Sequence, residues 1–263
     1  MITTDVTSSV MNSVNSPSVT QFMEEISLTI AAQGLAPSMM SQDFLKSSGI
    51  IPQDWELAQQ PVLNPNFAQL NFTNGVGINA QPRTINLSES LSNKKTADVT
   101  IHQVASQYLE KMPHAEYIGF SFNPKILIPF PHNPQAVRQF ITESLLGSGA
   151  WKHIGRIPVQ AGVNLLYCLD RCQLTINISE ANLQKPQTAP VAAILFSSSF
   201  NYSVRVEAKE SSNRMTQMIN FLEHWQTDLE EFRAIVHQKF LDSTAADETQ
   251  SIGGMSVFPG QML

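Results

Sequence analysis

One histidine and two carboxylates near the end of the chain have the spacing of a proton-transfer pair. His224 and Asp228 are four positions apart, so on a helix they share a face, and Glu231 lies close to that face. An imidazole beside a carboxylate can act as a general acid. The simpler interpretation, which we favour, is a solvated helix face beside the apolar seam of the same helix.

The two cysteines, Cys168 and Cys172, flank the dipeptide Asp170-Arg171. If this dipeptide is the turn of a hairpin, the two thiols could lie opposite each other and form a redox-dependent cross-link. The alternative is a pair of ordinary core thiols, which we favour because cysteine behaves as a small buried apolar residue. Two cysteines also exclude a disulfide-stapled scaffold and a four-thiolate zinc site.

Motifs that would hold a metal ion, a phosphate group or a catalytic serine do not occur in the sequence. The six histidines are at least twelve positions apart, which excludes the His-x-x-x-His spacing of zinc sites. Gly147-Ser148-Gly149 lacks the surroundings of a nucleophile elbow, and Gly75-Val76-Gly77 suits a hairpin better than a phosphate loop. We therefore predict no cofactor, no metal and no catalytic residue.

The charge balance bears on the partners that the chain can have. There are 16 Lys and Arg against 22 Asp and Glu, a net charge of −6, so we predict no nucleic-acid partner. A secretory signal begins with basic residues, whereas residues 1–19 contain no Lys or Arg. No apolar stretch reaches the roughly 18 residues of a membrane-spanning helix. The expectation is a cytoplasmic protein with no membrane partner.

The periodicity of apolar residues predicts an α+β fold. Strands are expected over 25–31, 67–72, 76–80, 83–87, 116–122, 159–169, 173–178 and 191–206, and helices over 42–48, 101–111, 136–146 and 213–241. The sheet or sheets would be mainly antiparallel, with helices on one side and a long C-terminal helix. In the most specific version of this prediction, the body consists of two ferredoxin-like halves.

Three prolines, Pro129, Pro131 and Pro134, give the best boundary within this body. We expect one α+β half-domain over 21–130 and a second over 131–241, with disordered tails at 1–20 and 242–263. Local signals set the ends of some elements: Ser41 and Thr100 are expected to cap helices, and Asn74-Gly75 suits a type I′ turn.

Four segments together carry a likeness to other proteins: 41–55, 74–82, 117–124 and 225–229. Through these segments the chain resembles a set of uncharacterised bacterial proteins of similar length. The resemblance covers most of residues 21–241 and implies an α+β body. It implies no activity and no functional residue.

The low content of charged residues, 14%, favours a surface that another molecule covers, because burying Asn, Gln, Ser and Thr costs less than burying charges. Apolar residues occur on more than one side of the predicted helix 213–241, and we predict five partner-binding residues there: Met215, Met218, Phe221, Trp225 and Phe232. The alternative is burial of both sides within one body.

We therefore expect a non-enzymatic cytoplasmic interaction or assembly protein, whose partner is another protein or a second copy of the chain in a homodimer. The alternative function is that of an enzyme or small-ligand-binding protein whose site is assembled from dispersed residues. Arg83, His153 and Arg156 are the polar residues proposed for such a site.

Overall fold

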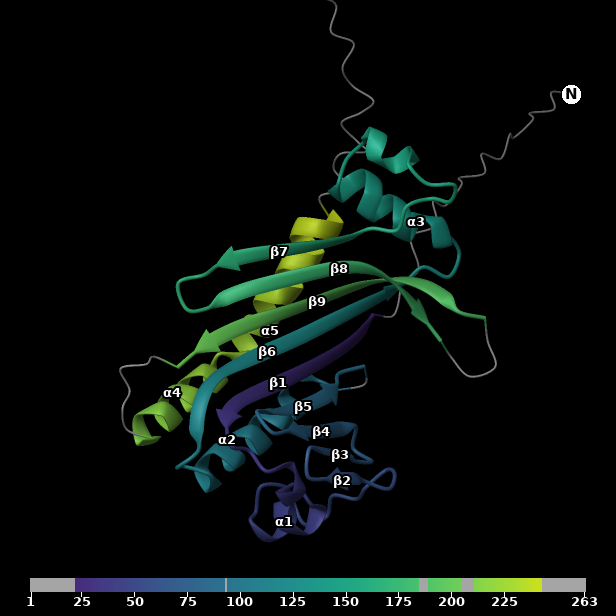
Figure 1. Ribbon diagram of the computed structural model, residues 1–263. Helices are drawn as coiled ribbons and strands as arrows, with labels where there is room; N and C mark the ends of the chain where they lie inside the picture. Colours follow the sequence, from purple (N-terminus) through teal and green to yellow (C-terminus); the bar gives the residue numbers. More distant parts are fainter. Residues whose placement is uncertain (1–21, 93, 185–188, 205–210, 243–263) are drawn as a thin grey trace, which may run out of the picture.

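The computed structural model describes residues 22–92, 94–184, 189–204 and 211–242, and its strands form one nine-stranded sheet (Figure 1). The expected tails, 1–20 and 242–263, lie outside these residues except for Asp242. The strands are β1 (Met23–Gln33), β2 (Val62–Asn64), β3 (Phe67–Asn71), β4 (Val76–Gln81), β5 (Thr84–Ser90), β6 (Glu116–Pro129), β7 (Gly162–Cys168), β8 (Gln173–Leu183) and β9 (Val191–Ser203). The α+β class is confirmed.

The strand order, β2-β3-β4-β5-β1-β6-β9-β8-β7, joins the two expected halves in a single sheet. Every neighbouring pair is antiparallel, and the central strand β1 pairs with both β5 and β6. The proline cluster begins at the last residue of β6, yet β6 itself pairs with β9 from the later half of the chain. The two halves therefore do not form separate sheets.

Helices cover one face of this sheet, and α2, α4 and α5 lie behind the strands in Figure 1. The α-helices are α1 (Gln42–Ser47), α2 (Ile101–Lys111), α3 (Pro134–Gln139), α4 (Ser211–Glu223) and α5 (Trp225–Ala234). Helix α3 continues into a π-helical turn, η3 (Phe140–Leu145), and α5 into another, η5 (Ile235–Leu241). The expected helix 213–241 thus consists of α4, α5 and η5, with a break at His224.

The core lies between the sheet and the helices. Alternate residues of each strand point into it, such as Ile26, Leu28 and Ile30 of β1, which are at most 1% exposed. The long C-terminal helix contributes a seam of apolar residues that recur every three or four positions, and all of them are buried: Met218, Leu222, Trp225, Leu229, Phe232 and Val236. Burial of this seam supplies much of the free energy that holds the long helix on the sheet.

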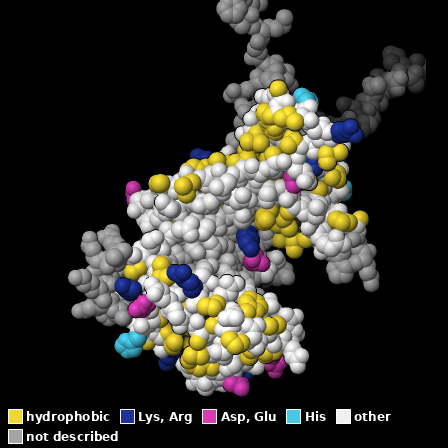
Figure 2. Space-filling model, viewed as in Figure 1, with side chains coloured by type: hydrophobic (Ala, Val, Ile, Leu, Met, Phe, Trp, Pro, Cys, Tyr) yellow, Lys and Arg dark blue, Asp and Glu magenta, His cyan; other side chains and the backbone are white. Residues whose placement is uncertain are grey.

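The opposite face of the sheet carries mainly uncharged polar side chains, and it faces the viewer in Figure 2. A hydrogen-bonded row crosses four strands: Asn86 Nδ2 and Asn123 Nδ2 both donate to Thr29 Oγ1, at 3.0 and 3.2 Å, and Ser199 Oγ donates to Asn123 Oδ1 at 2.6 Å. Charges near the middle of the face come as a pair, because Lys125 lies 3.1 Å from Glu25. The scarcity of charged residues in the sequence is therefore most evident on this face of the sheet.

Three local predictions need correction. The 67–80 hairpin has a three-residue loop in place of the type I′ turn: the Gly75 N–H donates to the Phe72 carbonyl, and Gly75 adopts a φ of 85°, as in a type I turn followed by a bulge. Strict alternation over 116–122 predicts that Ile118 shares the core face with Phe120 and Phe122 and that Tyr117 lies on the opposite face. In β6 the register shifts beside Ala31, so Tyr117 is buried and Ile118 is exposed. Thr100 makes no side-chain cap on α2.

Ser41, in contrast, caps α1 as predicted, since its Oγ accepts a hydrogen bond from the Phe44 N–H at 3.2 Å.

Candidate functional site

Three of the five residues predicted to bind a partner fill the chain's own core. Met218 and Phe232 are fully buried, and Trp225 is 6% exposed and stacks on His102 with the ring centroids 5.0 Å apart. In this structure they offer no surface to another chain, which corrects their assignment as partner contacts. Met215 and Phe221 are half-buried, and the Phe221 ring stacks on Tyr202 at 5.1 Å.

The expected solvated face around Asp228 is in fact a buried ionic cluster. Asp228 is fully buried and accepts hydrogen bonds from Arg171 Nε at 3.0 Å and Arg171 Nη2 at 2.7 Å through Oδ1. Its Oδ2 accepts from the Tyr202 hydroxyl at 2.7 Å, and Glu231 also pairs with Arg171. His224 stays exposed with its ring stacked on that of Tyr202.

The electrostatics of this cluster favour a fixed ion pair. Burial raises the pKa of Asp228, while Arg171 and Tyr202 act in the opposite direction. Burial also disfavours the charge on Arg171, but hydrogen bonds to Glu231 and Asp228 outweigh it and raise the pKa of the guanidinium. Burial and the Asp228 acceptor raise the pKa of Tyr202, so it donates as a neutral phenol. The carboxylate therefore has its oxygens occupied by its own chain, and the cluster ties the β7–β8 turn to α5.

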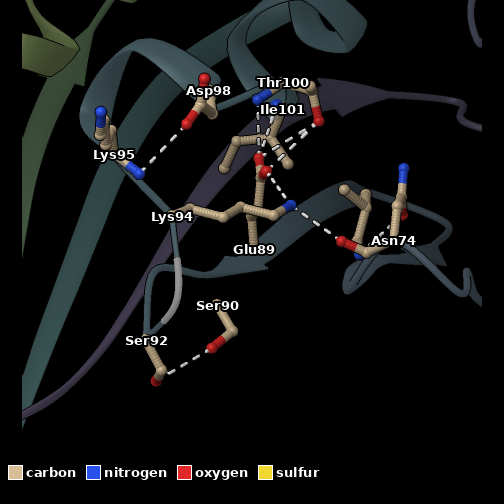
Figure 3. A network of polar contacts seen from close by, with 10 residues as sticks. Asn74, Glu89, Ser90, Ser92, Lys94, Lys95, Asp98, Thr100 and Ile101 are labelled. Carbon is tan, nitrogen blue, oxygen red and sulfur yellow. Dashed lines mark hydrogen bonds and ion pairs between the residues drawn. The ribbon is translucent and has the colours of Figure 1, made fainter.

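A second buried carboxylate, that of Glu89 at the end of β5, lies on the same helix-covered face of the sheet, and groups of its own chain also occupy its oxygens (Figure 3). Its Oε2 accepts from the N–H groups of Thr100 and Ile101 at 2.8 and 2.9 Å, and Lys94 Nζ lies 2.6 Å from its Oε1. Lys94 also donates to the Asn74 carbonyl at 2.8 Å. Glu89 thus caps α2 in place of Thr100 and connects it to the β3–β4 loop, which is a structural role.

The remaining sequence candidates do not form one site. Arg83 lies in the β4–β5 turn, whereas His153 and Arg156 precede β7 at the far edge of the sheet. Five strand spacings of about 4.8 Å separate β5 from β7, on the order of 24 Å. Both cysteines are free, but only Cys172 is buried: Cys168 is exposed, which corrects the prediction of a pair of core thiols. Burial raises the pKa of the Cys172 thiol, which suits the predicted core thiol.

Two surface clefts have the size of small-molecule sites. One, of about 430 Å³, lies between the end of α2 and the segment after β1, and Met39, Phe44 and Lys111 contribute to its lining. The other, of about 470 Å³, lies beside α3, where Arg138 is already paired with Glu180 at 3.0 Å. Asp228 and Glu89 line neither of these clefts, nor a third of about 380 Å³ between α1 and the start of α2.

The most distinctive exposed feature is the edge of the sheet formed by β7 and the segment before it. The sequence of β7, Gly162-Val-Asn-Leu-Leu-Tyr-Cys168, contains no charge and no proline, and its Leu166 is 62% exposed. Sequence reasoning identified β7 as a strand but could not find this surface, because which strand lies at an edge depends on the strand order.

Across the described ranges, no helix combines the length and the apolar character needed to cross a bilayer. The same ranges hold no group of three or more His, Cys, Asp or Glu side chains placed to bind a metal ion. No protein-family model matches the chain, and no curated protein matches its sequence, so the bacterial resemblance stays a prediction.

Proposed function

We propose that the chain is a non-enzymatic assembly protein of the cytoplasm that pairs with a second copy of itself along β7. The observation that carries the proposal is the unprotected edge of the sheet. An edge strand presents a row of unpaired backbone N–H and C=O groups, and monomeric proteins protect such rows with charges, prolines, bulges or short strands. Strand β7 extends over seven residues and has no proline or charged side chain.

The other edge of the same sheet is protected in these ways. Strand β2 has only three residues, Val62–Asn64, and Pro61 and Pro65 lie directly on either side of it. A second chain could therefore add few backbone hydrogen bonds at β2, whereas β7 can accommodate a full strand. This asymmetry argues for pairing at one edge of the sheet only, which gives a closed dimer and not an open fibre.

The geometry of β7 suits antiparallel pairing with an identical strand. The Leu169 N–H donates to the Cys172 carbonyl across the turn, so odd-numbered residues of β7 bond to β8. Gly162, Asn164, Leu166 and Cys168 then direct their N–H and C=O groups outward. With a two-fold axis at Leu165, residue 164 opposes 166 of the second copy and 162 opposes 168, which allows about eight hydrogen bonds.

Other observations fit this function better than the enzyme alternative. The buried carboxylates of Asp228 and Glu89 are occupied by groups of their own chain, and Arg83 lies at the opposite side of the sheet from Arg156. Both cysteines are free, which suits the reducing environment of the cytoplasm.

The experiment is a measurement of molar mass by light scattering and sedimentation on the whole chain at about 50 µM. We expect the wild type to be a dimer. Leu166→Lys places a charge at the centre of the proposed pairing and should give a monomer, as natural edge lysines do. Val62→Lys makes the same change at the exposed edge β2 and should leave the dimer intact.

Leu166 is exposed, so its replacement should not unfold the chain, and circular dichroism checks that both variants keep their strands. A monomeric wild type, or a Leu166→Lys variant that dimerises as well as the wild type, would overturn the proposal.

A further inference from the structure

Exposed apolar side chains concentrate in one segment of the molecule. Of the eleven large apolar side chains exposed among the described residues, three lie between η3 and β7: Leu146, Ile154 and Ile157. The two most exposed are Ile154, at 85%, and Ile157, at 80%. Figure 2 shows hydrophobic side chains gathered at the top of the molecule, beside Lys or Arg and His side chains. Isolated exposed apolar residues need no explanation, but a local cluster marks a binding surface.

The charge of this segment is opposite to that of the chain. Residues 144–169 contain Lys152 and Arg156 and no Asp or Glu, although the whole chain has a net charge of −6. In the part of the chain that the structure covers, no carboxylate forms an ion pair with either cation. Lys152 Nζ lies 5.7 Å from the ring centroid of Trp151. An aromatic ring, two cations and two exposed isoleucines thus lie within residues 151–157, which we name the 151–157 loop.

The helical segment that precedes this loop is fixed to the body of the protein. The preceding helix α3 is tied to β8 by two hydrogen bonds of 3.0 Å between Arg138 and Glu180. After α3, the Phe140 ring packs against Phe196 in the core at 6.2 Å. In Figure 1 the segment between α3 and β7 lies at one end of the molecule, beyond the sheet. Residues Ala150–His153 form a 3-10 turn, so the loop leaves this anchored segment with its first residues in a regular backbone.

We propose that the 151–157 loop binds the surface of an anionic lipid bilayer. Two isoleucines and their neighbours cover much less than the roughly 800 Å² per partner of a stable protein interface. A bilayer sets no such minimum: apolar side chains enter the boundary between headgroups and acyl chains, and nearby cations interact with the lipid phosphates. Trp also favours this boundary, because its ring is apolar and its N–H can reach water.

This inference revises the prediction of no membrane partner, which rested on the lack of a spanning segment. A surface contact needs no such segment, and the anionic inner leaflet of the plasma membrane faces the cytoplasm in which we place the protein. The inference is independent of the pairing along β7, because the loop belongs to each copy by itself.

The test is co-sedimentation of the whole chain with vesicles of phosphatidylcholine containing about one third phosphatidylglycerol. We expect binding that is lost on pure phosphatidylcholine vesicles and weakened by salt. Two double variants, Ile154→Ser/Ile157→Ser and Lys152→Glu/Arg156→Glu, should each lower the apparent affinity about tenfold or more. All four side chains are partly or largely exposed, so the variants should fold normally.

Matched controls make the same changes elsewhere. Arg83→Glu reverses an exposed charge in the β4–β5 turn, and Met39→Ser removes an exposed apolar side chain, and both should bind as the wild type does. The proposal is overturned if the wild type does not sediment with the anionic vesicles, or if the loop variants bind as well as the controls. Loop-dependent binding to soluble polyglutamate, without vesicle binding, would show an acidic protein partner and would also overturn it.

Discussion

Removing either partner of the Asp228–Arg171 ion pair should destabilise the protein, and Arg171→Ala should cost more than Asp228→Ala. The reason lies in what each change leaves behind. Arg171→Ala leaves a carboxylate that is fully buried, whereas Asp228→Ala leaves a guanidinium that is 28% exposed and still paired with Glu231. Breaking a buried pair costs about 3–5 kcal/mol when the remaining charge has no partner. We expect about that loss for Arg171→Ala and about 2 kcal/mol for Asp228→Ala.

The assay is urea and thermal unfolding of the whole chain. For a chain of this size, each kcal/mol lowers the Tm by about 2–4 °C, so Arg171→Ala should unfold roughly 6–20 °C below the wild type. Glu231→Ala removes the partly exposed partner of the same arginine and is the control, with an expected cost of less than about 1 kcal/mol.

The pH dependence of the free energy of unfolding gives a second and independent test. Burial raises the pKa of Asp228, and Arg171 is among the groups that oppose this effect. In Arg171→Ala less opposes the effect of burial, so the pKa of Asp228 is raised further and the Asp228 carboxylate takes up a proton on folding. This proton uptake makes the folded state of the variant more stable at lower pH. The deficit of this variant relative to the wild type should therefore shrink as the pH falls from 7 toward 5. An equal cost for Arg171→Ala and Glu231→Ala, or a deficit that grows on acidification, would refute the reasoning.

Two further predictions concern the start of α2, where Glu89, Thr100 and His102 lie. Glu89→Gln should lower the free energy of unfolding by about 2–4 kcal/mol, because it leaves Lys94 without its ionic partner and weakens the cap of α2. Thr100→Ala should change this free energy by less than about 0.5 kcal/mol, because the Thr100 side chain does not cap the helix. Urea unfolding measures both. Burial lowers the pKa of His102, so its contribution to stability is present above pH 6.5 and is lost as the pH falls below that value. His102→Phe keeps the ring stacked on Trp225, and between pH 7.5 and 5.5 it should lose less stability than the wild type, by up to about 1.4 kcal/mol. Equal costs for the Glu89 and Thr100 variants, or parallel pH profiles for the wild type and His102→Phe, would contradict these expectations.

Periodicity in the sequence was enough to predict the elements that bury one regular stripe. The apolar residues of the long helix recur every three or four positions, as on a helix packed on one side, although the sequence assigned Met218, Trp225 and Phe232 among them to a partner and the core buries them instead. The cap of α1 at Ser41 also followed from a local rule, since an N-cap and the N–H group that it binds are only three residues apart.

Contacts between distant residues could not be predicted in this way. The pair of Arg171 and Asp228 spans 57 positions, and no spacing rule distinguishes a buried aspartate from a solvated one at the same place on a helix. Glu89 replaces Thr100 as the cap of α2 because the end of β5 meets the start of that helix, which only the packed sheet brings about. The register shift beside Ala31 likewise depends on the partner strand, and it reversed the expected burial of Tyr117 and Ile118.

The same ionic pair bears on the proposed assembly, because it holds the strand that would pair. Arg171 lies in the turn that follows β7, and its contact with Asp228 fixes that turn against α5. At the other end, η3 packs against β7, and Phe140 of η3 is anchored on Phe196 of β9. An edge that is held at both ends has already lost most of the conformational freedom that association would otherwise remove. This rigidity explains how seven residues with few large side chains could suffice for pairing: the backbone groups of β7 lie in register before the second copy arrives.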